Sequence, residues 1–146
     1  MILDNYLMFD PPAAPAALAQ VVGTYTSCNT IDLHSASMIP VLANLQGARD
    51  MGIGDSPALK LLVQVSTAFT SASAATLQVA LQGATDNGSG APNTFVTWWT
   101  SPLYALATIA VVGARLYDMD MPRPPAGVAV PRFLRMAYLI GTATTT

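Results

Sequence analysis

The sequence contains no glutamate and a single lysine, Lys60, and charged residues make up only 10% of its 146 residues. An ordinary soluble domain has about 25%. Glutamate and lysine favour helix surfaces, whereas aspartate, which supplies all 8 acidic residues here, favours turns and caps. The composition therefore argues against long exposed helices. The net charge of −2 gives no reason to expect a nucleic-acid partner.

Long hydrophobic runs are also missing, although 52% of the residues are hydrophobic and the mean hydropathy is +0.44. A membrane-spanning helix needs about 20 mostly apolar residues. The best run, residues 103–114, is shorter and contains Tyr104, Thr108 and Gly113. The first residues lack a basic region followed by an apolar stretch, so we expect no secretory signal. Burial against partner proteins is the remaining way to cover so apolar a surface.

Residues that could carry chemistry are scarce. His34 is the only histidine and Cys28 the only cysteine, so a Ser-His-Asp or Cys-His catalyst would have to use His34, which has no recognisable companion motif. A single cysteine excludes an internal disulfide and a cysteine zinc cluster and fits synthesis in a reducing cytosol. Asp118 and Asp120 do not match a calcium loop. We predict a protein that is not an enzyme and that has no cofactor and no metal.

Two segments alternate with a period of two, the pattern of a half-buried strand. The first covers residues 59–66, and the second covers residues 76–82 and is expected to stop at Gly83. The residues predicted to face inward are Leu59, Leu61, Val63 and Val65 in the first segment and Leu77, Val79 and Leu81 in the second. Gln78 and Gln82 are predicted to face outward.

Further strands are expected within residues 23–33, 94–100, 107–116 and 128–140. Turns or loops are expected at residues 34–47, 49–57, 86–93 and 121–127, with Asn87-Gly88 supplying positive-φ positions and residues 49–52 forming a turn that leads into a central strand. Short strands separated by turns predict an all-β sandwich or barrel, with helix confined to one or two short turns. Residues 1–20, interrupted by prolines, are predicted to be an N-terminal arm, and residues 21–146 to be one β-sandwich domain.

Several residues are candidates for protein contacts. Trp98 and Trp99 are adjacent, so in a regular strand they would face opposite sides, and one of them would meet solvent or a partner. Arg132 and Arg135 are candidate interface anchors near the start of the last strand, although solvated positions are an equal alternative. The predicted contact residues are Leu3, Tyr6, Met8, Phe9, Trp98, Trp99, Arg132 and Arg135.

Five segments, in this order and spacing, resemble the capsid cement proteins of short-tailed phages such as the Bordetella phage. They are TIDL at residues 30–33, ARDMGIGDSP at 48–57, LVQV at 62–65, AATLQV at 74–79 and RFLRMAY at 132–138. The resemblance implies a jelly-roll β-sandwich on the outer surface of an icosahedral head. It also implies that the protein joins neighbouring capsomers of a major capsid protein with the HK97-like fold, and it carries over no catalytic residues.

The chain departs from these cement proteins in two places. Residues 34–47 look longer than the usual link, and the chain ends where the relatives continue into another strand, so we expect a neighbour to close the final sheet or the sheet to be incomplete. We expect a homodimer, with a trimer as the alternative, in which the arm and the edge strands make contacts. We expect the protein to be made in the host cytoplasm. A carbohydrate- or ligand-binding module of a tail fibre, with Trp98, Trp99 or Tyr104 as a stacking platform, is the competing hypothesis, and a hydrolase on a β scaffold has little support.

Overall fold

The structure is a computed structural model that describes residues 8–11, 22–33, 60–71, 75–129 and 131–141. Its elements, in chain order, are β1 (Gly23–Thr26), β2 (Ile31–Asp32), β3 (Lys60–Gln64), β4 (Thr76–Ala84), β5 (Val96–Thr100), β6 (Tyr104–Ala105), α1 (Leu106–Ile109), β7 (Arg115–Asp120) and β8 (Phe133–Gly141). Strands make up 47% and helix 4% of this part of the chain, which confirms the all-β prediction.

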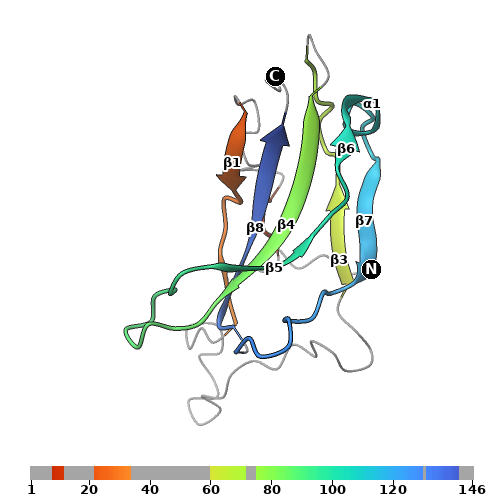
Figure 1. The fold of residues 1–146 in the computed structure, drawn as a ribbon. Helices are drawn as coiled ribbons and strands as arrows, with labels where there is room; N and C mark the ends of the chain where they lie inside the picture. Colours follow the sequence, from red (N-terminus) through yellow and green to blue (C-terminus); the bar gives the residue numbers. More distant parts are fainter. Residues whose placement is uncertain (1–7, 12–21, 34–59, 72–74, 130, 142–146) are drawn as a thin grey trace, which may run out of the picture.

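Within these described ranges every strand pairing is antiparallel, and the strands form two sheets (Figure 1). The larger sheet has the order β1-β8-β4-β5, with β2 also pairing with β8 and β6 with β4, and the smaller sheet pairs β3 with β7. The pairings β1 with β8, β3 with β7 and β4 with β6 are nested within one another along the chain. A long antiparallel ribbon that wraps into two layers gives this nesting, as the jelly-roll prediction requires.

The core lies between the two sheets. The rows Leu77 with Ile140, Val79 with Tyr138 and Leu81 with Met136 face inward from β4 and β8. From the smaller sheet Leu61 is buried, and Val63 packs against the same cluster. The alternation predicted for residues 59–66 and 76–82 is confirmed over the described residues, because the inward positions from Leu61 onward are buried or pack against the cluster. Leu59 lies outside the described residues. β4 runs one residue past the predicted stop at Gly83, to Ala84.

A β-bulge changes the direction of one tryptophan. Leu81 pairs with Trp99, but the next residue of β4, Gln82, pairs with Thr97, so Trp98 is an extra residue in β5. Its indole lies against Gly83, on the inward side, and it belongs to the core cluster. The prediction that Trp98 and Trp99 face opposite sides is wrong, because a bulge interrupts the alternation on which it rests.

Three other predicted strands differ from the structure. Residues 107–116 do not form one strand: α1 occupies the first part, a turn with Gly113 at φ 84° follows, and β7 begins at Arg115. The last strand begins at Phe133 rather than at residue 128, so Arg132 precedes it. β3 belongs to the two-stranded sheet and is not central to the larger one. The loop at 34–47 and the turn at 49–57 lie outside the described residues.

Candidate functional site

The larger sheet has a second face, turned away from the core. By strand register, Thr24, Leu139 and Gln78 share one row of this face, and Arg135, Gln82 and Thr97 share another. A row between them ends in Thr26 and Thr100 and has Ala137 and Ala80 at its centre. We define the outer face as the accessible residues of these rows: Thr24, Thr26, Gln78, Gln82, Thr97, Thr100, Arg135 and Leu139. Arg135 is the only charged residue among them.

Arg135 is held in a fixed position on the outer face. Its Nε donates to Oε1 of Gln82 at 2.8 Å, and its guanidinium lies 3.9 Å from the centre of the Phe95 ring. The Gln82 amide in turn donates to the Thr97 hydroxyl at 3.1 Å, so one polar chain crosses β8, β4 and β5. No carboxylate of the described residues forms an ion pair with Arg135. Burial alone lowers its pKa from the ordinary arginine value.

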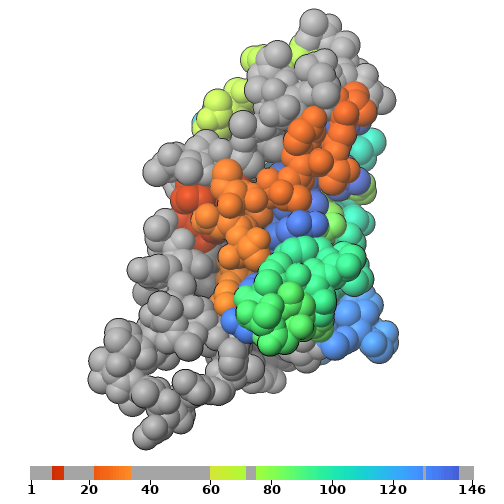
Figure 2. Space-filling model, turned by 90° about the vertical axis from the view of Figure 1, so that its left-hand side faces the viewer, coloured from red at the N-terminus to blue at the C-terminus, as the bar shows by residue number. Residues whose placement is uncertain are grey.

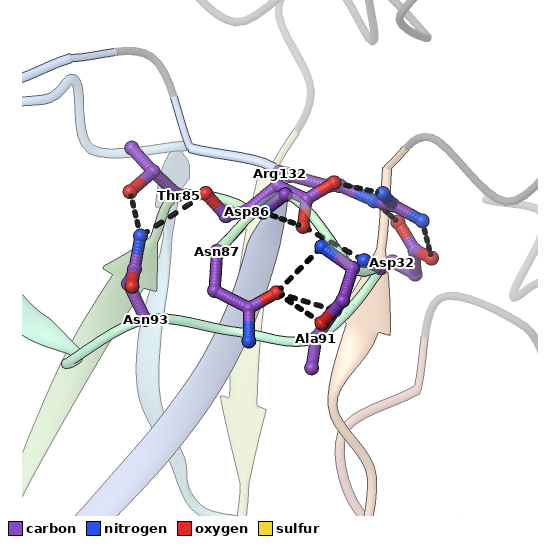
Figure 3. A network of polar contacts seen from close by, with 10 residues as sticks. Asp32, Thr85, Asp86, Asn87, Ala91, Asn93 and Arg132 are labelled. Carbon is purple, nitrogen blue, oxygen red and sulfur yellow. Dashed lines mark hydrogen bonds and ion pairs between the residues drawn. The ribbon is translucent and has the colours of Figure 1, made fainter.

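Arg132 has the opposite arrangement, because two carboxylates neutralise it (Figure 3). Its Nε and Nη2 donate to the two carboxylate oxygens of Asp32 at 2.9 and 3.0 Å, and its Nη1 pairs with Asp86. The guanidinium also lies 4.9 Å from the centre of the Phe133 ring. This cluster, which we call the Arg132 clamp, ties the end of β2 and the loop after β4 to the start of β8.

The same clamp orders the loop between β4 and β5 (Figure 3). Oδ1 of Asp86 accepts the backbone N–H groups of Gly88 at 2.9 Å and Gly90 at 3.0 Å, while its other oxygen faces Arg132. Oδ1 of Asn87 accepts the N–H of Ser89 at 2.9 Å. The predicted positive-φ turn is confirmed at Gly88, where φ is 90°. The aspartate therefore acts as the organising residue of the loop.

The charges of the Arg132 clamp support one another. The hydrogen bonds that Arg132 donates to Asp32, and then to Asp86, raise the pKa of Arg132 above its ordinary value, so it stays charged. Burial by itself would raise the pKa of Asp86, but the N–H groups of Gly88 and Gly90 and the Arg132 guanidinium together hold that pKa below its ordinary value. Arg132 and Asp86 therefore both stay ionised at neutral pH, and the clamp can hold the loop in place throughout that pH range.

Both tryptophan rings make contacts inside the protein. Trp98 is 9% exposed, and its buried indole nitrogen has no hydrogen-bond partner among the described residues. Trp99 is partly buried, and its ring lies 4.3 Å from that of Tyr117, so it joins the larger sheet to β7. Tyr104 donates its hydroxyl to the carbonyl of Leu116 in the same inter-sheet region. These three rings link the sheets to each other.

Residues 8–11 of the predicted arm lie on the protein's own domain, beside residues 22–33 (Figure 2). The carbonyls of Met8 and Phe9 accept the side-chain amide and the backbone N–H of Asn29, at 3.0 and 2.9 Å. Asp10 accepts the N–H of Cys28 at 2.9 Å and the hydroxyl of Tyr138. Burial, and then the bond to Asp10, raise the pKa of Tyr138 well above its ordinary value.

The ring of Phe9 also packs against the core cluster. Residues 8–11 of the arm therefore pack on the domain of the same chain. Leu3 and Tyr6 lie outside the described residues.

Exposed large hydrophobic side chains occur in loops and near strand ends rather than in the outer face. In the described part of the chain they are Val22, Val96, Leu103, Val111, Val112 and Met119. Val111 and Val112, 56% and 62% exposed, form the tip of the turn after α1. These two adjacent valines form a small exposed apolar surface at the loop tip.

The structure brings the predicted contact residues to different places: Arg135 to the outer face, Arg132 to its clamp, Trp98 and Trp99 to the core, and Met8 and Phe9 to the β1–β2 side. The prediction missed Gln82 and Phe95, which contact Arg135. It also missed three aspartates: Asp10, which accepts a hydrogen bond from Tyr138, and Asp32 and Asp86, which pair with Arg132. Within the described ranges there is no cluster of metal-ligating side chains, and no helix there is long and apolar enough to cross a membrane. Cys28 is exposed, and His34 lies outside the described residues.

Comparison with known protein families finds a match to a family model described as Bbp16, which covers residues 16–146. The chain belongs to the Bbp16 family. Both sheets, the Arg132 clamp and the outer face fall within the matched residues. The family bears a Bordetella-phage-type protein name, so membership indicates a virion-associated bacteriophage protein. A search of curated proteins finds no match.

Proposed function

We propose that this Bbp16-family protein is a non-enzymatic capsid cement protein. It binds the outer surface of the phage head and bridges neighbouring capsomers of a major capsid protein with the HK97-like fold. Family membership over residues 16–146 is the observation that carries the proposal, because it indicates a phage protein. The resemblance of five ordered segments to capsid cement proteins supplies the specific role.

The surface of the described part of the chain suits this role. The outer face is the surface of an antiparallel sheet with hydroxyl, amide and aliphatic side chains and one charge, and Val111 and Val112 form a separate apolar loop tip. A stable protein interface is depleted of charged residues at its centre and enriched in arginine. The outer face has this composition. We further propose that the protein acts as a homodimer, with a trimer as the alternative, because closed assemblies of identical chains most often have two-fold symmetry.

The tail-fibre alternative draws no support from the tryptophans. Trp98 is buried and Trp99 packs on Tyr117, so these rings do not form an open platform for a sugar. Capsid contacts need no such platform.

Heads assembled in the absence of this protein test the proposal. We expect them to lose DNA at a lower temperature than complete heads. Adding the purified protein should raise this temperature back to that of complete heads. A reconstruction of the restored heads should show added density outside the shell at capsomer boundaries. Density in the tail, or heads that are equally stable without the protein, would contradict the proposal.

A further inference from the structure

Arg135 differs from Arg115 and Arg132 in ways that point to a binding role. Arg132 is paired with two carboxylates and Arg115 with Asp118 at 2.7 Å, whereas Arg135 forms no ion pair in the described part of the chain. Its Nε is bonded to Gln82, which leaves the terminal N–H groups of the guanidinium as donors. A cation that is partly removed from water and has no counter-charge is costly. The lowered pKa of Arg135 has the same cause, because burial makes the charged form less favourable.

The position of Arg135 is already fixed. Stacking on Phe95 at 3.9 Å and the 2.8 Å bond to Gln82 orient the guanidinium plane. A guanidinium held in this way loses little freedom when it forms a two-pronged bond to a carboxylate. The neighbours on the outer face are uncharged, so a partner gains a directed contact here without competing charges.

We propose that Arg135 is the anchor of the outer face and binds a carboxylate side chain of the capsid shell protein. This inference rests on the proposed function and names the chemistry of its partner. A second copy of this chain is the less suitable occupant. The outer face offers no carboxylate to another outer face, so a second copy would have to present an aspartate from outside this face.

Binding of the full-length protein to heads made without it tests the anchor. Arg135→Gln removes the charge and keeps a polar side chain, and we expect at least about tenfold weaker binding, the loss typical of an interface anchor. Arg115→Gln is the matched control, because it removes an exposed arginine from β7 and should leave binding unchanged. Arg135→Lys, which keeps the charge but loses the fork, should give an intermediate affinity.

Two further measurements separate a contact from a structural effect. Binding by the wild type should weaken as salt is raised, and binding by Arg135→Gln should depend less on salt. The melting temperature of each variant identifies any loss of folding, and Phe95→Leu, which removes the stacking partner but keeps the cation, should weaken binding less than Arg135→Gln does.

The outcomes separate the two proposals. If the wild type binds heads and folded Arg135→Gln binds equally well, the anchor is wrong and the cement role stands. If the wild type does not bind, both are wrong. If Arg135→Gln changes the oligomeric state in sedimentation while binding to heads is unchanged, the face is a contact between copies and the anchor proposal is overturned.

Discussion

The indole ring of Trp98 lies only 2.5 Å from the point that a Cβ atom would occupy on Gly83. The bulge in β5 turns Trp98 inward, and only glycine leaves room for the ring over β4. We expect Gly83→Ala to lower the free energy of unfolding by about 1–3 kcal/mol, the cost typical of an overpacked core. Urea unfolding followed by tryptophan fluorescence measures this change.

The control for this prediction is a double-mutant cycle with Trp98→Leu. Leucine removes the ring that the new methyl group would meet, so the two changes together should cost less than the sum of their separate costs. If the costs simply add, then the contact between these two positions is not what requires glycine.

The Arg132 clamp should hold the loop of residues 86–93. Arg132→Met keeps the aliphatic stem but removes the charge that pairs with both Asp32 and Asp86. We expect a lower melting temperature and faster amide exchange at Gly88 and Gly90. Arg115→Met, which breaks the exposed pair with Asp118, should change little. Equal effects of the two changes would contradict a structural role for the clamp.

The stability of the folded protein should fall in acid as Asp86 becomes protonated. Its pKa is lower in the folded protein than the ordinary value of about 3.9. Its stabilising contribution is therefore complete above that ordinary value and is lost as the pH falls through the folded-state pKa. We expect Asp86→Asn to lower the melting temperature at neutral pH, and the difference from wild type to shrink below about pH 4. A difference that is the same at every pH would rule out this linkage.

Much of the fold is predictable from local pattern, because the alternation within residues 59–66 and 76–82 reports burial on one face directly. Trp98 was misplaced because a bulge depends on pairing with β4 and leaves no trace in the period of the strand itself. The segment containing α1 is short and apolar, and such runs fit a helix or a strand equally well. The partners of Arg132 are 46 and 100 residues away in the sequence, so only the sheet topology brings them together.

The Tyr138 hydroxyl should hold residues 8–11 of the arm against the larger sheet. Tyr138→Phe keeps the buried ring but removes the hydroxyl that Asp10 accepts. We expect a loss of about 1–2 kcal/mol in the free energy of unfolding, because the partner is a charged group. We also expect faster proteolysis near residues 8–11. Tyr117→Phe, whose hydroxyl makes only a 3.4 Å contact at the surface, is the control and should cost less. An equal loss in the free energy of unfolding for both variants would contradict this role of the hydrogen bond between Tyr138 and Asp10.

The copy number of this chain in purified virions tests the cement role most directly. Quantitative mass spectrometry against the major capsid protein gives that number without relying on any variant. A cement that bridges capsomers over the whole head should be present at a stoichiometry comparable to that of the capsid protein. A copy number that matches a single tail, or absence from the virion, would contradict the proposed function.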